Sequence, residues 1–318
     1  MRWIVFLLAL IAAAPAEAQS WPIRPIRVIV PYPPGGPADI MGRLAAQLMQ
    51  EKLGATVVVE NRSGANGILG GEAVWQAAAD GYTLLAAPNV HVLARHVLRS
   101  VPYDPAKDFT PIIRYGEAPL LVLANPSAVS GKTIAEALPA IRAKPQDFRF
   151  GLSALGATNH LAVLEFNRLT GLNLLIVPYR GSAPALSDLL GGQVQLMIDP
   201  IIAALPNVQG GLLRALAVTS VKRTSAAPDV PTAAESGLPG LEFSSWYGLW
   251  GPKGLSPGIV GRLNGVLTEA VRDPAVVQRL KALGFEPASG SPEEFARYIE
   301  ADVARGAALL RAAKFEPL

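Results

Sequence analysis

The stretch IRVIVPYPPGGPADIMGRLAAQLMQEKLG, from Ile26 to Gly54, decides the fold of this chain of 318 residues. Its β-branched beginning predicts a strand over Ile26–Pro31. After Ala38 the apolar residues recur at intervals of three and four, which predicts an amphipathic helix with one buried face. Gly54 follows this pattern directly and is typical of the residue that ends a helix. A strand joined by a short loop to a crossover helix is the repeating unit of a parallel sheet, so we predict the α/β class.

The same alternation of short apolar runs and helical stretches continues to the end of the chain. Further strands are predicted at Thr56–Glu60, Tyr82–Ala86, Leu120–Ala124, Phe148–Leu152, Leu174–Pro178, Val194–Ile198, Leu213–Val218 and Trp246–Trp250. The last helix is marked by Ser291, Pro292 and Glu294, a cap residue followed by proline at the first helical position and an acidic residue. We expect this helix to extend to about Lys314.

The N-terminal segment has the pattern of an export signal. Arg2 provides the positive end, Ile4–Ala14 is almost wholly apolar, and Ala16–Ala18 forms an A-x-A cleavage site. That apolar run is shorter than the roughly 20 residues that span a membrane, and no later stretch replaces it. We therefore predict a signal peptide over residues 1–18, cleaved near Ala18, and an exported mature protein.

The composition excludes several classes of site and partner. The chain has no cysteine, which excludes a disulfide framework, a thiolate metal site and a lipid-modified cysteine. Charged residues make up only 17% of it and the densest basic cluster is Lys222–Arg223, so we expect no nucleic acid as a partner. His91 and His96 lack a neighbouring cysteine or an H-E-x-x-H pattern. We therefore expect no metal and no cofactor.

No low-complexity linker divides the chain, so two lobes would have to be joined by ordered segments. Leu120–Pro126 and Phe243–Pro252 are extended apolar runs closed by proline, with continuous strand–helix units between them. We therefore predict that residues 19–121 and 246–318 form lobe 1 and that residues 122–245 form lobe 2. Small ligands usually bind in a cleft between such lobes.

The first candidate binding loop is Tyr32–Asp39, between the first strand and the first helix. Gly35 and Gly36 let a ligand approach the backbone, and the helix start offers unpaired N–H groups. An anion is the expected ligand, although such a loop is equally typical of a tight turn. Asp39 is expected to cap the helix, because a carboxylate would repel an anion placed close to it.

The second and third candidate loops are Gly151–His160 and Pro178–Ser182. Both lie between a predicted strand and a predicted helix, at the carboxyl ends of strands, where ligands of open parallel sheets bind. The alternative for the hydroxyl groups of Ser153, Thr158 and Ser182 is ordinary N-capping. Convergence of the three loops on one negative group favours the binding interpretation.

A hydrolytic triad of Ser153, His160 and Asp199 is the catalytic alternative. The sequence around Ser153 lacks the glycine two places later that a nucleophile elbow requires. His160 has the apolar neighbours Leu161 and Leu164, where packing is the ordinary role of a histidine. We therefore expect no enzyme activity and no catalytic residue.

Further motifs run along the chain in a definite order. They are Pro33–Asp39 with Arg43, Val57–Arg62, Gly64–Gly67, Asp80–Leu84, Pro102–Pro105 with Asp108–Phe109, His160–Ala162, Val177–Gly181, Asp188–Gly192, Arg214–Ser220, Pro228–Thr232 and Glu235–Gly240. In content and order this set resembles the substrate-binding receptors of tripartite tricarboxylate transporters, the Bug family of TctC-like proteins. The resemblance covers nearly the whole mature chain.

The resemblance implies a type II periplasmic-binding-protein fold, in which two Rossmann-like α/β lobes are joined by two crossing strands and enclose a ligand cleft. It also implies that backbone amides, hydroxyl groups and ordered waters hold a ligand carboxylate. The residues at the matching positions are Tyr32, Pro34, Gly35, Gly36, Asp39, Ser153, Ala157, Thr158, Asn159, Tyr179, Arg180, Gly181 and Asp199, the last near the rim. An ordered water would let Asp39 take part without repelling the ligand.

Two departures from the family pattern bear on the ligand. Arg180 replaces the more usual lysine and keeps the positive charge on a planar fork of donors. Ala154, Leu155 and Asn159 stand where glycine and small polar residues are commoner. An apolar wall there would favour a longer aliphatic or an aromatic carboxylate over a hydroxylated one such as citrate.

The resemblance thus implies a periplasmic solute-binding receptor that captures a small organic carboxylate, either a dicarboxylate or an aromatic carboxylate. Its partners would be that ligand and the membrane components of a tripartite transporter, and we expect a monomer. Two alternatives stay open: a binding protein that senses a ligand for a signalling partner, and a periplasmic hydrolase that uses Ser153.

Overall fold

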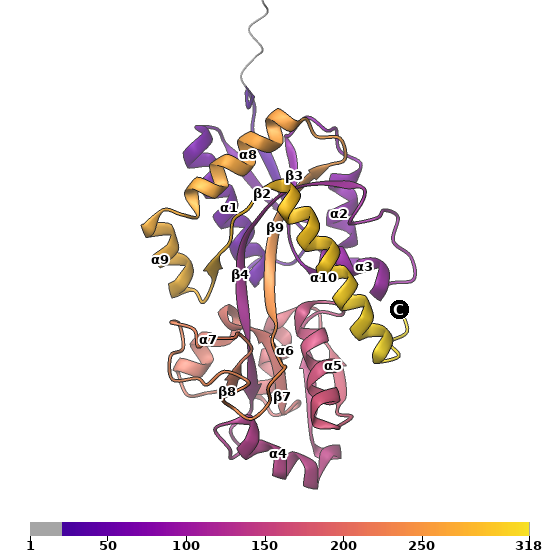
Figure 1. Ribbon diagram of the computed structural model, residues 1–318, viewed down its shortest axis with the longest axis vertical. Coiled ribbons are helices and arrows are strands. Elements are labelled where there is room, and N and C mark those ends of the chain that lie inside the picture. The colour runs from indigo at the N-terminus through magenta and orange to yellow at the C-terminus, as the bar shows by residue number, and fades with distance from the viewer. Residues whose placement is uncertain (1–20, 318) are drawn as a thin grey trace, which may run out of the picture.

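The computed structural model describes residues 21–317, and the predicted signal peptide lies outside this range. Strands and helices alternate within it, and the chain forms two lobes, called here the upper and the lower lobe, as they lie in Figure 1. The chain is thus of the α/β class with two lobes, as the sequence predicts.

The upper lobe is built on a mixed sheet. Three parallel strands, β1 (Ile26–Val30), β2 (Val57–Asn61) and β3 (Thr83–Pro88), lie in the order β2-β1-β3. The antiparallel strands β9 (Ser244–Pro252) and β4 (Phe109–Ala124) continue this sheet, and the short β10 (Glu286–Pro287) pairs with β4. The helices around it are α1 (Pro37–Leu53), the 3-10 helix η1 (Ala65–Gly67), α2 (Ile68–Trp75), α3 (Val90–Val97), α8 (Pro257–Ala270), α9 (Pro274–Ala282) and α10 (Pro292–Ala312).

The lower lobe repeats the strand–helix unit on a smaller sheet. The strands β5 (Arg149–Leu152), β6 (Leu175–Pro178) and β7 (Leu196–Pro200) are parallel, and β8 (Arg214–Val218) pairs with the far end of β4. Its helices are α4 (Ile134–Ala143), the 3-10 helix η2 (Pro145–Asp147), α5 (Thr158–Thr170), α6 (Ser182–Leu190) and α7 (Ile201–Gln209).

Two long strands, β4 and β9, run between the lobes (Figure 1). β4 pairs with β9 from Phe109 to Pro119, and beyond Pro119 it pairs with β7 and β8. The predicted strand Leu120–Ala124 covers only the last part of β4. The earlier part was missed because Pro111, Gly116 and Pro119 interrupt its apolar pattern. The β4–β9 ladder accommodates such residues with two register shifts. The lobe boundaries at 121/122 and 245/246 stay a prediction.

The other elements follow the local sequence signals closely. The remaining predicted strands lie within two residues of the observed ends. Gly54 ends α1 with a φ of 63°, the left-handed conformation that glycine adopts without strain. Ser291 and Glu294 form the predicted capping box, and α10 ends at Ala312, two residues before the predicted end. None of the helices within residues 21–317 is long and apolar enough to cross a membrane.

The last helix, α10, contacts both lobes. In the upper lobe its Phe295 packs on the buried indole rings of Trp246 and Trp250 in β9. After the helix, the ring of Phe315 lies 5.2 Å from the ring of His160 in α5 of the lower lobe. The C-terminal segment therefore runs alongside the strands that connect the lobes (Figure 1).

Candidate ligand-binding cleft

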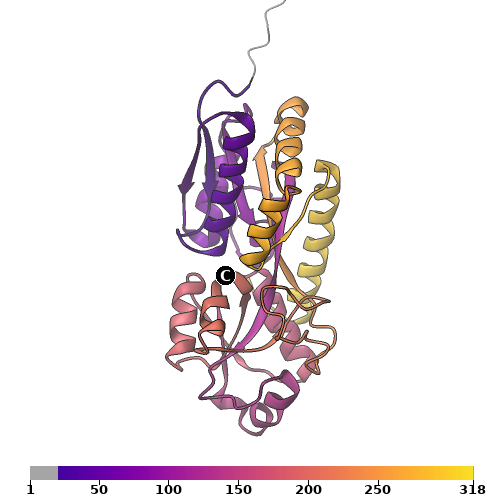
Figure 2. The same ribbon diagram turned by 90° about the vertical axis from the view of Figure 1, so that its left-hand side faces the viewer.

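A cavity of about 390 Å³ lies between the lobes and is bordered by loops from both of them. Figure 2 shows the indigo N-terminal part of the upper lobe facing the pink helices of the lower lobe. Ten of the thirteen predicted site residues line the cavity, namely Tyr32, Pro34, Gly35, Gly36, Ser153, Ala157, Thr158, Asn159, Arg180 and Gly181. The three predicted loops thus meet at one cavity, and their contact with a ligand stays a prediction.

The three predicted loops lead into α1, α5 and α6, which begin at this cavity. Their N-cap residues are Gly36, Ala157 and Gly181, and no side chain caps the first turn of any of the three. The first N–H groups of each helix therefore have no partner within the helix. Together with the helix dipoles, these groups create a positive potential suited to an anion.

The hydroxyl groups near these helix starts do not act as N-caps. Thr158 and Ser182 are the first residues within their helices and follow the cap residues. Thr158 Oγ1 is buried and has no hydrogen-bond partner among residues 21–317. Ser153 Oγ donates instead to the carboxylate of Asp199, at 2.5 Å. The capping alternative is therefore wrong for all three hydroxyl groups.

Asp39 supports the first loop from behind and does not line the cavity. Its Oδ2 accepts hydrogen bonds from the Gly35 N–H at 3.0 Å and from Arg43 Nε at 2.9 Å, and its Oδ1 accepts from Asn61 Nδ2 at 2.8 Å. Burial acts to raise the pKa of Asp39, but these hydrogen bonds and the charge of Arg43 outweigh it and hold that pKa below its usual value. Asp39 is therefore ionised, and its carboxylate holds the glycine loop in place.

Asp199 is fully buried behind the cavity wall, and its predicted place near the rim is wrong. Its Oδ1 accepts from Ser153 Oγ at 2.5 Å and from Asn159 Nδ2 at 3.4 Å. Its Oδ2 has no partner among the described residues. Burial raises the pKa of Asp199 to about 6, and the hydrogen bond from Ser153 opposes that rise only in part. Asp199 therefore changes its charge slightly below neutral pH.

His160 does not complete a catalytic triad. Its Nδ1 accepts a hydrogen bond from the Gly156 N–H at 3.1 Å, while Ser153 donates directly to Asp199. Burial lowers the pKa of His160 to about 4, so the ring is neutral at physiological pH. Ser153, His160 and Asp199 therefore do not have the Ser-His-Asp arrangement that the hydrolase alternative requires.

Tyr179 belongs to an adjoining cavity of about 820 Å³, on the outer side of the same loops. Its hydroxyl donates to Asp188 Oδ2 at 2.7 Å, so it ties the third loop to the C-terminal part of α6. Arg180 lines both cavities and is exposed, with no ion-pair or hydrogen-bond partner for its guanidinium among the described residues. It is also the one charged side chain among the described residues that line the 390 Å³ cavity.

Sequence reasoning missed the part of the wall that comes from β3, α7 and β9. Asn89 directly follows β3 and begins α3, so the rule about the carboxyl ends of parallel strands could have found it. Its Oδ1 is buried and has no partner among residues 21–317. Ser245 and Tyr247 come from the first half of β9, where no local signal marks them.

Most of the remaining wall is aliphatic or proline. These residues are Pro33, Pro37, Ala38, Pro88, Val90, Ala154, Ala183, Pro184, Leu186, Pro200 and Ala203. A wall of this kind gains free energy from burying hydrocarbon and offers few partners for extra hydroxyl groups on a ligand.

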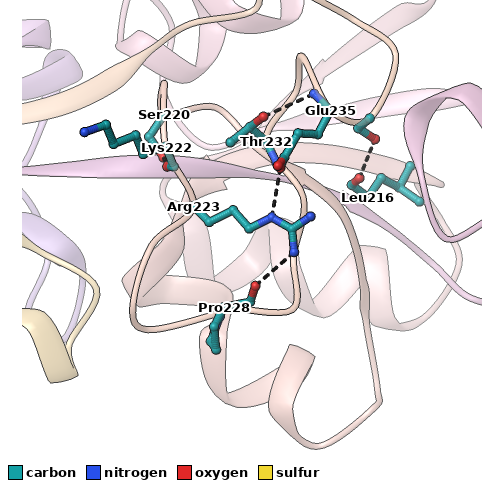
Figure 3. Close-up of polar contacts among 8 residues, drawn as sticks. Leu216, Ser220, Lys222, Arg223, Pro228, Thr232 and Glu235 are labelled. Carbon is teal, nitrogen blue, oxygen red and sulfur yellow. Dashed lines mark hydrogen bonds and ion pairs between the residues drawn. The ribbon is translucent and has the colours of Figure 1, made fainter.

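A further cavity, of about 620 Å³, lies beside the loop Ser220–Thr224. Figure 3 shows how this loop is held: Arg223 donates to Glu235 at 2.9 Å and to the Pro228 carbonyl at 3.2 Å. The charged side chains that line the cavity have both signs, being Glu117, Lys222, Arg223, Glu242, Glu286, Asp302 and Arg305. Such a wall does not favour an anion, so the 390 Å³ cavity is the better candidate. Within the described part of the chain, no cluster of three His, Asp or Glu residues could hold a metal ion.

Comparisons with known proteins agree with this geometry. The sequence profile of the family described as "Tripartite tricarboxylate transporter family receptor" matches residues 41–315. The protein BugT of Bordetella pertussis is 38% identical over 309 residues, which cover 96% of this chain and 94% of BugT.

Among solved structures, R. palustris Rpa4515 with adipate is 37% identical, with a TM-score of 0.89, 94% of this chain covered and 100% of that one. MatC of Rhodopseudomonas palustris with bound malate is 32% identical, with a TM-score of 0.83, 91% of this chain covered and 100% of that one. The periplasmic binding protein BugD is 34% identical, with a TM-score of 0.85 and coverage of 94% and 100%.

Proposed function

This chain belongs to the family of tripartite tricarboxylate transporter receptors, and we propose that its cleft captures an aliphatic dicarboxylate for such a transporter. Receptors of this family bind solutes and are not enzymes. The observation that carries the proposal is the convergence of three uncapped helix starts on one largely apolar cavity.

The helix starts account for the first carboxylate of the ligand. The N–H groups of α1 come from the upper lobe and those of α5 and α6 from the lower lobe, so one anion between them contacts both lobes. Hydrogen bonds from N–H groups to a carboxylate are charge-assisted and contribute about 1.5–3 kcal/mol each. Capture of the anion would therefore favour a closed arrangement of the lobes.

Arg180 accounts for a second carboxylate. It lies where the 390 Å³ cavity meets the adjoining one, and no acidic side chain neutralises it among the described residues. A ligand with an anionic group at each end would place one at the helix starts and the other at this guanidinium, with the carbon chain along the proline and alanine wall.

The ligands of similar proteins support this class of compound. Adipate, bound to R. palustris Rpa4515, and malate, bound to MatC, are both dicarboxylates. Adipate has an unsubstituted chain of methylene groups, which suits the apolar wall better than the hydroxylated chain of malate. The proposed order of affinity is therefore adipate above malate, and both above citrate.

The remaining parts of the proposal concern export and partners. An export signal over residues 1–18 would take the protein to the periplasm, where it would deliver the ligand to the membrane components of the transporter. Deletion of the gene would then abolish uptake of the ligand. Normal uptake with loss of a ligand-dependent response would instead support the signalling alternative.

A panel of matched acids tests the ligand class. Adipate, hexanoate, malate, citrate and benzoate are compared by thermal shift and calorimetry, since a ligand at a hundred times its Kd stabilises the folded state by about 2.7 kcal/mol. Hexanoate has the same length as adipate with one carboxylate fewer, and should bind at least about tenfold more weakly. Equal binding of adipate and hexanoate would contradict the role of the second carboxylate. Tightest binding of benzoate would assign the cleft to aromatic acids, and binding of no acid would overturn the proposal.

A further inference from the structure

The motif Gly64–Gly67, at the entrance of the cleft, has an unusual backbone. Gly64 and Gly67 have φ angles of 138° and 93°, and between them Ala65 and Asn66 have φ angles of 47° and 52°. Side-chain-bearing residues rarely adopt this left-handed region, although asparagine tolerates it better than most. Two such residues in succession persist only where the surrounding structure holds them in place.

The side chain of Asn66 reaches across the cleft. The Asn66 Nδ2 donates to the main-chain carbonyl of Leu155 in the lower lobe, at 3.0 Å. The main-chain carbonyl of Asn66 accepts a hydrogen bond from Tyr32 OH at 3.3 Å. Asn66 and Leu155 both line the outer cavity of about 820 Å³. The left-handed backbone at Asn66 therefore accompanies a hydrogen bond that joins the upper lobe to the lower one.

The loop that receives this bond leads directly to the ligand cavity. Ser153 and Ala154 line the cavity, and Ala157 is the N-cap of α5. A second contact from the upper lobe holds the same loop, because a Cβ atom added to Gly156 would lie only 2.1 Å from a methyl carbon of Val97 in α3. The loop is thus clamped by α3 on one side and by Asn66 on the other.

We infer that Asn66 is a positioning residue, which fastens the Leu155 loop to the upper lobe when the lobes enclose the ligand and thereby slows ligand release. This inference rests on the proposed function. The bond from Asn66 to Leu155 must break before the lobes separate, so its free energy opposes dissociation. It has no role before the lobes meet, so the association rate constant does not depend on it.

Asn66→Gly isolates the side chain from the backbone, because glycine adopts the same left-handed conformation without strain. Loss of one neutral hydrogen bond should raise koff for adipate by about 2- to 10-fold, with kon within twofold of the parent value. Asn66→Asp keeps the shape but sets a carboxylate oxygen against the Leu155 carbonyl, and should raise koff further. Asn173→Gly, at an exposed asparagine that lines none of the three cavities described here, is the matched control and should change neither rate constant.

Stopped-flow measurements give both rate constants, and circular dichroism checks that each variant folds. The chain has no cysteine, so the pair Glu51→Cys and Ser187→Cys allows spin labels to be placed on one helix of each lobe. With adipate bound, the interlobe distance should broaden in Asn66→Gly and remain narrow in Asn173→Gly. Parent-like koff and distances in both Asn66 variants would overturn the inference. Failure of the parent protein to bind any acid would instead overturn the proposed function.

Discussion

Helices that begin at the cleft and helices that begin away from it differ in how their N-termini are built. Away from the cleft, α4, α8, α9 and α10 each have a side chain that accepts a hydrogen bond from the first turn. These caps are Thr133, Ser256, Asp273 and Ser291. At the cleft, α1, α5 and α6 have no such cap. A cap contributes about 1 kcal/mol to the free energy of unfolding. The three cleft helices lack this stabilisation, and their first N–H groups are free to bind an anion.

The largest expected effect on ligand affinity comes from giving α5, which begins at the cleft, a side-chain cap like those of α4, α8, α9 and α10. Ala157 has the extended backbone of an N-cap, so Ala157→Asp would cap α5 without rearrangement. The new carboxylate would take the free N–H groups and repel the ligand. We expect adipate affinity to fall at least about 100-fold while the free energy of unfolding rises by about 1 kcal/mol. Calorimetry and urea denaturation measure the two effects, and retained affinity would show that α5 does not hold the anion.

A smaller effect is expected from the cation that borders the cleft. Arg180→Ala should weaken adipate binding about tenfold, because it removes one exposed charge-assisted contact and leaves the helix starts intact. Arg180→Lys keeps the charge and should recover most of the affinity. If calorimetry found that Arg180→Ala abolishes binding while Ala157→Asp leaves it unchanged, recognition would depend on a side-chain ion pair and not on the helix starts.

The reverse change removes the side-chain cap of α10, a helix that begins away from the cleft. Ser291→Ala removes one half of the capping box at the start of α10, where the side chain accepts from the Glu294 N–H. The free energy of unfolding should fall by about 1 kcal/mol, and adipate affinity should not change. Urea denaturation and calorimetry on the same preparation check both. Loss of adipate affinity in this variant would mean that the caps of helices away from the cleft also affect ligand binding.

The smallest expected effect is a pH dependence that arises behind the cleft. Burial raises the pKa of Asp199 to about 6, so this carboxyl becomes charged in the folded protein as the pH rises through that value. Its contribution to folding is therefore present at low pH and lost as the pH rises through about 6. Above that pH the buried charge also opposes a nearby anion, so adipate affinity should rise about twofold from pH 7.5 to pH 6, a range in which adipate stays mainly dianionic. Asp199→Asn should remove this dependence in calorimetry, and an unchanged slope would assign it to another group.

Much of the candidate site could be predicted because it is local. Each of the three binding loops joins a strand to a helix, and the carboxyl ends of parallel strands gather at one edge of a sheet. That rule brings Ala157 and Gly181 to one edge of the lower sheet, whereas Gly36 follows β1 in the upper sheet and meets them only because the two lobes face each other. It says nothing about the direction of a side chain, so it could not show that Asp39, expected as a helix cap, and Asp199, expected near the rim, both lie behind the wall.

The sequence by itself determined the strands, the helices, their caps and the family, because hydrophobic periodicity and capping depend on residues a few positions apart. Only the tertiary structure decided the length of β4, whose interrupting prolines are tolerated because β9 lies beside it. It also decided which polar groups have partners. Asn66 and Leu155 are 89 residues apart and meet only because the two lobes pack against each other. Hydrogen bonds of this kind depend on how the lobes are oriented, and no local pattern in a sequence contains that orientation.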